Sequence, residues 1–239
     1  MKKITFFIPS FNEEKTIEKS IRVILDLKFK SKEIIIIDNG SKDKTQEIIK
    51  KFVNYKNVKI ILRSKNLGYG ASVKKAIKMS KSKYMYIHFS DLEYDHKTSI
   101  KMFAMAENNN FDAIFGSRLK KMNFEQKFKA IKTKPAFVAT IIFTTLYNLF
   151  YKKKFTDVIG SKFYKVSSLK KIINTNENYF NFDFILKNRL ISGDFKIGEV
   201  YTKYWPRKNN EDKNVKFYHM FPGIYQILKF KFLIFLKKL

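Results

Sequence analysis

The sequence of 239 residues contains no cysteine, four prolines and three histidines. The absence of cysteine excludes a disulfide framework and a thiolate metal site. The histidines, at positions 88, 96 and 219, lie too far apart in sequence to indicate a local metal-binding set. We therefore assign them no role.

Long apolar runs are also missing. No uninterrupted apolar run reaches the roughly 18 residues that would indicate a membrane-spanning helix. The start of the chain, Met1-Lys2-Lys3, lacks the apolar core and cleavage site of a secretory leader. We expect no transmembrane helix and a cytoplasmic location.

Acidic residues are scarce: 21 Asp and Glu stand against 49 Lys and Arg, a formal net charge of +28. Such an excess predicts attraction to nucleic acid, an anionic membrane or phosphorylated substrates. The alternative is compositional, because Lys, Asn, Ile and Phe are all abundant, as in an AT-rich genome. No zinc-finger pattern, RNP motif or basic zipper is present, so we expect no nucleic-acid partner.

Strand-like runs alternate with helical spacing of apolar residues through the first half of the chain. The expected strands are residues 3–8 (stopped by Pro9), 34–37, 58–62, 84–89 and 112–115. Helical spacing follows each of the first four runs. This alternation predicts an α/β fold with a Rossmann-like, mostly parallel sheet and helices on both faces. Right-handed crossovers would bring the post-strand loops to one crevice.

The alternation stops after residue 120. Residues 119–134 are basic and polar, and residues 136–151 are strongly apolar with lysines on both sides. We expect helices near 166–173 and 180–192 and a strand near 196–204. The 136–151 segment and the basic amphipathic tail, 217–239, have the composition of interfacial helices on an anionic membrane. The alternative is that both pack into the core or a dimer interface.

Three acids, Asp91, Glu93 and Asp95, follow the predicted strand 84–89. Hard oxygen ligands at a strand end suit Mg or Mn. A solvated acidic loop or a helix N-cap is the alternative explanation. The Asp38-Asn-Gly-Ser41 and Asn66-Leu-Gly-Tyr-Gly70 loops are equally ambiguous, since each could be a turn or part of a nucleotide pocket.

The order of the motifs is more informative than any one of them. Together they resemble family 2 glycosyltransferases with the GT-A fold. The motifs are Ile8-Pro-Ser-Phe-Asn-Glu-Glu14, Ile36-Ile-Asp-Asn-Gly-Ser-Lys-Asp-Lys-Thr45, Asn66-Leu-Gly-Tyr-Gly-Ala71, Asp91-Leu-Glu-Tyr-Asp95 and Gly116-Ser-Arg118. Thr156-Asp157, Lys162, Phe182-Asp183, Glu199, Tyr204-Trp-Pro-Arg207 and Glu211-Asp-Lys213 resemble the dolichyl-phosphate mannosyltransferase and polyprenyl-phosphate glycosyltransferase branch.

The resemblance implies a role for each matched position. Asp91 would ligate the metal with help from Glu93, and Arg118 would face an acceptor phosphate with Lys162. The donor nucleotide sugar would contact Pro9, Phe11, Glu13, Asp38, Asn39, Gly68, Gly70 and Ser90, with Arg207 and Lys213 closing over its diphosphate.

The reaction implied is an inverting transfer of a hexose from a GDP- or UDP-linked sugar to a polyprenyl phosphate. The metal and the two cations of the closing loop would stabilise the departing diphosphate. A lipid phosphate is already anionic and needs no general base. A glycan hydroxyl, the alternative acceptor, needs a carboxylate base, for which Asp157 and Asp183 are the candidates.

Three positions depart from the branch pattern. Phe89 stands where the metal motif usually has its first Asp, Asn39 stands where a second Asp is common, and Ile185 stands where Glu is frequent. Because Phe cannot ligate a metal, a catalytically weak or non-catalytic nucleotide-sugar-binding homologue is a further alternative.

The expected organisation is a glycosyltransferase domain, 1–216, followed by the tail, 217–239. Within that domain, residues 1–118 would bind the nucleotide sugar and residues 119–216 the acceptor. The resemblance places the protein peripherally on the cytoplasmic face of a membrane, either on the lipid itself or beside a membrane-protein partner.

Overall fold

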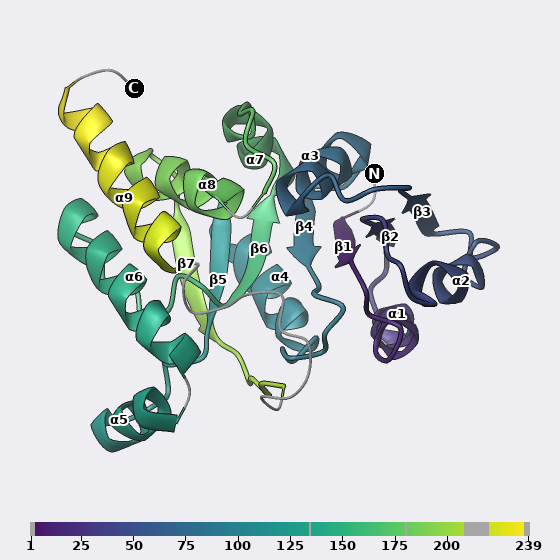
Figure 1. Ribbon diagram of the computed structural model, residues 1–239, viewed down its shortest axis with the longest axis horizontal. Helices are drawn as coiled ribbons and strands as arrows, with labels where there is room; N and C mark the ends of the chain where they lie inside the picture. Colours follow the sequence, from purple (N-terminus) through teal and green to yellow (C-terminus); the bar gives the residue numbers. More distant parts are fainter. Residues whose placement is uncertain (1–2, 134, 180, 208–219, 237–239) are drawn as a thin grey trace.

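The computed structural model describes residues 3–133, 135–179, 181–207 and 220–236 (Figure 1). Its centre is a seven-stranded sheet with the order β3-β2-β1-β4-β6-β5-β7. The strands are β1 (Ile4–Ser10), β2 (Lys32–Asp38), β3 (Val58–Leu62), β4 (Tyr84–Ile87), β5 (Ala113–Ser117), β6 (Ser161–Lys165) and β7 (Ile197–Tyr201).

Of the seven strands in the described residues, only β6 runs against its neighbours: it is antiparallel to both β4 and β5, whereas the other strand pairings are parallel. The predicted mostly parallel sheet is therefore confirmed. The strand-helix alternation gave no signal for β6, because this strand returns from the far half of the chain to lie between two strands of the first half.

The isoleucines of β2 explain why its apolar run is unbroken. Ile35 and Ile37 belong to one hydrophobic core, and Ile34 and Ile36 belong to the other. Successive side chains of a strand point to opposite faces, so a strand covered on both sides is apolar throughout.

Helices cover both faces of the sheet (Figure 1). One core includes residues from α1 (Ile17–Asp26), α2 (Thr45–Lys50) and α4 (Thr98–Asn109). The other includes residues from α3 (Tyr69–Met79), α6 (Pro135–Tyr151), α7 (Val166–Ile172), α8 (Asn181–Ser192) and α9 (Met220–Phe235). Among the described helices, none is both long and apolar enough to cross a membrane.

Strand β1 continues through Pro9 to Ser10, so the expectation that Pro9 stops it is wrong. The pairing of β1 with β4 ends at Phe7, while its pairing with β2 extends through Pro9 to Ser10. Proline has no N–H group to donate to a neighbouring strand. At Pro9 this costs no hydrogen bond to β4, because the pairing with β4 has already ended at Phe7.

An additional helix, α5 (Phe124–Thr133), lies in the stretch where no element was expected. A reciprocal capping box starts it: Gln126 N donates to Asn123 Oδ1 at 2.9 Å, and Asn123 N donates to Gln126 Oε1 at 3.1 Å. The Asn-x-x-Gln spacing is readable in the sequence, so this helix was predictable.

Candidate active site

Glu93 ties the end of β4 to the segment that follows β7. Its carboxylate accepts hydrogen bonds from Arg207 N at 2.8 Å and from the Tyr204 hydroxyl at 3.1 Å. Its backbone oxygen accepts a third bond, from Trp205 N at 2.8 Å. Both Glu93 carboxylate oxygens are therefore occupied by the chain itself.

Arg207 reaches from this segment to the end of β1. Its guanidinium forms an ion pair with Glu13, and both side chains are mostly buried. Glu13 is held in turn, because its backbone N–H donates to Thr45 and its carboxylate accepts from Thr16. Residues nearly two hundred positions apart, 13 and 207, thus meet beyond the end of β1, a contact that the sequence did not predict.

Asp91 lies beside this pair. Burial raises the pKa of Asp91 to about 6, and the Glu93 and Glu13 carboxylates push it in the same direction while Arg207 opposes them. Its Oδ1 accepts the Glu93 N–H at 3.1 Å. The preceding Ser90 is buried and donates to the Pro9 carbonyl at 3.0 Å, which fixes the strand end against β1.

The described residues contain no group of three or more His, Asp or Glu suited to holding a metal by themselves. Magnesium and manganese in nucleotide enzymes commonly take one or two carboxylates and complete their shell with phosphate oxygens and water. Asp91 fits such a site, because a cation would relieve the cost of its buried charge. Glu93 fits it less well while both of its oxygens are bonded to the 204–207 segment.

Asp38 and Asn39 build the loop after β2. Asp38 is fully buried and accepts hydrogen bonds from Gly40 N, Ser41 N and Gln46 Nε2. Asn39 joins this loop to the next one: its Oδ1 accepts from Arg63 at 2.8 Å and from Leu67 N at 3.1 Å. Asp38 therefore orders its own turn, and Asn39 sets the position of the 66–70 loop.

The two glycines of that loop are needed for packing. Gly68 has φ = +87°, and a Cβ there would collide with the Asn178 carbonyl. A Cβ on Gly70 would come within 2.5 Å of the Phe182 ring, and the Gly70 N–H donates to the Asn178 oxygen at 2.7 Å. The structure thus explains both glycines by contact with the segment leading into α8.

Arg118 forms a buried bidentate ion pair with Asp157. Arg118 Nε lies 2.6 Å from Asp157 Oδ2, and Nη2 lies 3.1 Å from Oδ1. Nη2 also donates to the Thr140 hydroxyl of α6, and the guanidinium lies over the rings of Phe137 and Tyr204. Burial alone would lower the pKa of Arg118, but Asp157 outweighs it and raises that pKa.

Asp157 uses its full accepting capacity. It is fully buried, and besides Arg118 it accepts the Ile159 and Gly160 N–H groups. Burial acts to raise the pKa of Asp157, yet Arg118 holds it below its ordinary value. Glu199 supports this turn from β7 by accepting the N–H groups of Thr156 and Asp157, each at 2.9 Å.

Asp183 lies between two lysines. Lys162 Nζ of β6 is 2.8 Å from Asp183 Oδ1, and Lys187, one turn along α8, contacts Oδ2. Although burial opposes them, the two ammonium groups hold the pKa of Asp183 below its ordinary range. Burial lowers the pKa of Lys187 to about 8 even with Asp183 beside it.

Phe89 fills the position where an Asp was expected. Its ring lies 5.5 Å from Lys162 Nζ, and ring centroids place it 6.1 Å from Tyr69 and 6.4 Å from Tyr94. Tyr94 continues to Tyr204 at 5.1 Å. An aromatic row therefore connects the 66–70 loop with Arg118.

Comparison with known proteins identifies the family. Residues 5–173 match Glycosyl transferase family 2. The chain belongs to this family.

Among curated relatives, it is 36% identical over 157 residues to the uncharacterized protein MJ0544 of Methanocaldococcus jannaschii, covering 62% of this chain and 63% of that protein. It is 24% identical over 217 residues to the poly-beta-1,6-N-acetyl-D-glucosamine synthase of Staphylococcus epidermidis, covering 85% of this chain and 48% of the synthase. The chain thus spans about half to two thirds of these relatives.

The fold agrees with solved glycosyltransferases. Glucosyl-3-phosphoglycerate synthase of Mycobacterium tuberculosis, in complex with Mn²⁺, UDP and phosphoglyceric acid, superimposes with a TM-score of 0.66 and 14% identity. The match covers 96% of this chain and 78% of the synthase. At this identity the likeness concerns the fold, which is GT-A as predicted.

The structure brings candidate residues together in three places at the strand ends: Glu13 with Arg207, Asp91 with Glu93, and Arg118 with Asp157. Lys162 and Asp183 form a separate ion-pair cluster behind Phe89. Phe11 is half-buried at the start of the β1 loop, and Lys213 lies outside the described residues.

Sequence reasoning missed Lys187, Thr140 and Arg63. Lys187 was detectable, because it stands four residues after Asp183 on a predicted helix, where opposite charges meet. Thr140 lies within an apolar run, and Arg63 follows a strand, so neither position carries a sequence signal.

Proposed function

We propose that the protein transfers a hexose, with inversion, from a nucleoside diphosphate sugar to the phosphate of a polyprenyl phosphate. The observation that carries this proposal is the state of Asp157 and Asp183, the two candidate bases. Both are held in buried ion pairs with lowered pKa values. A carboxylate in that state is a poor proton acceptor, whereas a phosphate acceptor is anionic and needs no base.

The donor would lie over the ends of β1, β2 and β4. Its nucleoside would contact Pro9, Phe11, Glu13 and the Asp38-Asn39 turn, with Gly68, Gly70 and Ser90 shaping the same pocket. Arg207 would exchange its contact with Glu13 for the diphosphate, and Lys213 would add a second cation. Because Arg207 would bind the diphosphate in place of Glu13, closure of its segment over the site would require the donor.

A divalent cation, Mg or Mn, would be held by Asp91 with Glu93 beside it. When bound, it would neutralise charge on the departing diphosphate. Arg207 would orient the leaving group. Arg118, held in place by Asp157 and Thr140, would keep the acceptor side of the crevice in position.

The acceptor phosphate would approach from the side of Lys162. The cluster of Lys162, Asp183 and Lys187 carries two cations and one anion. Its excess positive charge, close to the ring of Phe89, favours a phosphate over a neutral hydroxyl. Lys162 would therefore orient the nucleophilic oxygen.

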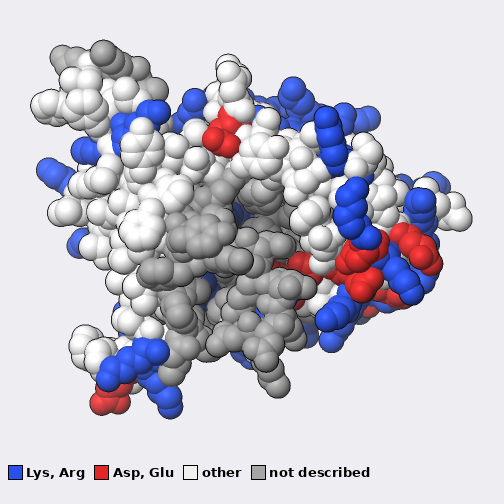
Figure 2. Space-filling view, viewed as in Figure 1, with Lys and Arg blue, Asp and Glu red and all other residues white. Residues whose placement is uncertain are grey.

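The face formed by α6 and α9 would rest on an anionic membrane surface. Five apolar side chains spaced four and three residues apart are exposed along α9: Phe221, Tyr225, Leu228, Phe232 and Phe235. Neither α6 nor α9 contains an acid, and Lys231 Nζ links them through the Phe150 carbonyl. Figure 2 shows mostly uncharged surface here, whereas acidic side chains gather over α1 and α2.

This arrangement suits a lipid bilayer better than a second protein, because lysines border the apolar surface and no acid interrupts it. Thr140 and Phe137 of α6 contact Arg118. The same helix would thus meet both the membrane and the acceptor side of the crevice, on the cytoplasmic face. A membrane-protein partner on the α6–α9 face is the alternative occupant.

The experiment compares two lipids that differ only in their phosphate. The protein is incubated with labelled UDP- and GDP-hexoses and Mg or Mn, and with either a polyprenyl phosphate or the polyprenol of equal length. Label is expected only in the polyprenyl phosphate. Transfer of label to the polyprenol would refute the proposed acceptor.

A glycan hydroxyl is the second candidate acceptor, favoured by the likeness to a poly-beta-1,6-N-acetyl-D-glucosamine synthase. It would require Asp157 or Asp183 to leave its ion pair. The third candidate, a weak or non-catalytic homologue, is favoured by Phe89; binding of a nucleotide sugar without metal-dependent turnover would support it.

A further inference from the structure

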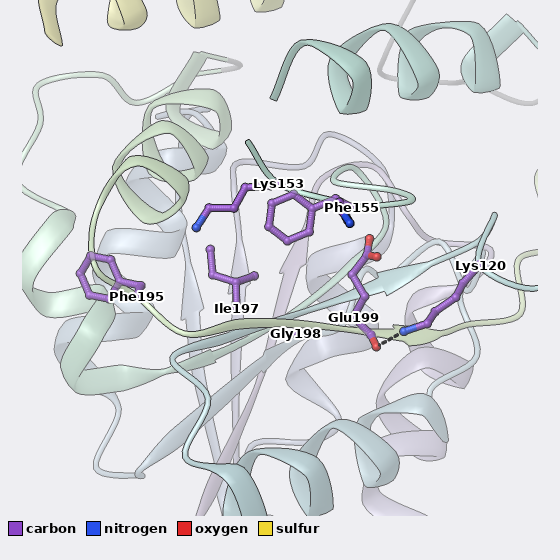
Figure 3. Close-up of a pocket in the computed structure, with 8 residues that line it drawn as sticks. Lys120, Lys153, Phe155, Phe195, Ile197, Gly198 and Glu199 are labelled. Carbon is purple, nitrogen blue, oxygen red and sulfur yellow. Dashed lines mark hydrogen bonds between the residues drawn. The ribbon is translucent and has the colours of Figure 1, made fainter. Parts of the chain in front are cut away.

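A cavity of about 300 Å³ lies beside β7, the edge strand of the sheet (Figure 3). The residues that line it are Lys120, Lys153, Lys154, Phe155, Phe195, Ile197, Gly198 and Glu199. Its size is at the lower end of the range for small-molecule sites. None of these residues has a part in the proposed donor or metal site.

Positive charge dominates this cavity. The Glu199 carboxylate is already bonded to the N–H groups of Thr156 and Asp157, and Lys120 donates to the Glu199 backbone oxygen at 2.6 Å. Within the described residues, the ammonium groups of Lys153 and Lys154 form no salt bridge. Three lysines therefore line a space whose one acid is already hydrogen-bonded to other groups.

The other walls are apolar. Figure 3 shows the rings of Phe155 and Phe195 on either side of Ile197. All three side chains are partly buried, and none offers a polar atom. An occupant would have to satisfy both features, presenting an anion to the lysines and an apolar body to this surface.

We propose that the cavity binds an organic phosphate, with the phosphate among the lysine ammonium groups and its apolar part on Phe155, Phe195 and Ile197. Lysine binds phosphate as a flexible point charge, so exposed lysines on two segments can converge on one group. Either an anionic lipid headgroup or a free phosphate ester has this chemistry. The site is separate from the proposed reaction and does not depend on it.

The test is calorimetric titration of the full chain with dihexanoyl phosphatidic acid kept below its micellar concentration. The double variant K153A/K154A is expected to bind roughly tenfold more weakly, as loss of two charge-assisted contacts predicts. The matched control is K170A/K171A, which removes two adjacent exposed lysines of α7. The control is expected to bind as the unaltered chain does.

Absence of binding would overturn the proposal. Equal weakening in both variants would also overturn it, because diffuse attraction of the anion to a basic protein would then account for the binding. Inorganic phosphate as competitor distinguishes the two sources. Displacement that depends on Lys153 and Lys154 supports a site for free phosphate compounds. Lysine-dependent lipid binding that inorganic phosphate does not displace supports a lipid headgroup site.

Discussion

Arg118 and Asp157 face each other through two parallel hydrogen bonds, Nε to Oδ2 at 2.6 Å and Nη2 to Oδ1 at 3.1 Å, with both side chains almost inaccessible to water. This pairing connects β5 to the turn before β6, and Thr140 extends it to α6. A residue that resemblance assigned to the acceptor thus also holds together the second half of the sheet.

Substitution R118A should destabilise the fold strongly. It would leave Asp157 buried without a counter-charge, a change that typically costs about 3–5 kcal/mol in the free energy of unfolding. R118K should recover only part of this, because an ammonium group cannot reproduce the bidentate geometry. Urea denaturation measures the difference.

The matched control is R22A, which breaks an exposed Arg–Glu pair four residues apart on α1. An exposed helical pair of this kind contributes little to stability, so the control should be nearly as stable as the unaltered chain. Similar losses for R118A and R22A would contradict the structural role of the buried pair.

Substitution D91N should stabilise the protein at pH 8 while weakening donor binding in the presence of Mg or Mn. Burial raises the pKa of Asp91 from 3.8 to about 6, so the folded protein holds this proton more tightly than the unfolded chain does. Ionisation therefore opposes folding as the pH rises from 4 to 6, and the cost persists above 6.

Asparagine has no charge to bury, so the melting temperature of D91N should exceed that of the unaltered chain at pH 8. The two should converge near pH 4. Thermal unfolding with and without a nucleotide sugar and Mn tests both parts. A D91N variant that is less stable at pH 8, or that keeps metal-dependent donor stabilisation, would show that Asp91 does not have the proposed role.

The two ends of the Asp183 cluster should respond differently to substitution. D183A leaves Lys162 and Lys187 buried without an anion and should cost about 3–5 kcal/mol. K187M leaves Lys162 paired with Asp183 and replaces a buried charge by an apolar chain of similar length. It should be neutral or stabilising at pH 7, and equal losses for the two variants would contradict this account.

K187M should also change the pH dependence of stability. Because the pKa of Lys187 is lowered to about 8 from 10.5, its charge opposes folding below pH 8, and this penalty fades as the pH rises toward 10.5. The unaltered chain should therefore gain stability relative to K187M across that interval. Parallel stability curves would show that Lys187 titrates normally.

The exposed apolar row of α9 should be needed for membrane binding. F232S/F235S should reduce co-sedimentation with vesicles containing anionic lipid. V53S/Y55S, which alters exposed residues next to α2 on the other side of the sheet, should not reduce it. A self-association change without a vesicle effect would instead assign the α9 row to a protein interface.

The first half of the fold was predictable because each strand and helix is local. The apolar run of β2 and the helical spacing of α1 carry their own signals, and parallel pairing follows from their alternation. Strand β6 was not predictable in the same way. Its pattern, Ser-Lys-Phe-Tyr-Lys, includes a buried lysine, Lys162, whose charge is paired with that of Asp183 on another element.

The candidate site was likewise predictable from local motifs in some parts and dependent on distant segments in others. Strand alternation predicted that the loops carrying Glu13 and Asp91 would converge, and in the structure Asp91 lies near Glu13. The ion pair of Glu13 with Arg207 was not predicted, because the resemblance placed Arg207 over the donor diphosphate. The motifs did not predict that Asp157 and Asp183 would both be neutralised by buried cations, since ion pairs formed between distant segments depend on tertiary packing. That pairing is the observation on which the proposed phosphate acceptor rests.

The most direct measurement is the chemical nature of the bond that the enzyme forms. The protein is given a donor labelled with carbon-13 at the anomeric position, together with a polyprenyl phosphate and a short glycan in the same reaction. The anomeric carbon of the product is predicted to show coupling to phosphorus in the NMR spectrum, as a glycosyl phosphate does. A labelled glycosidic linkage to the glycan, with no coupling to phosphorus, would contradict the account.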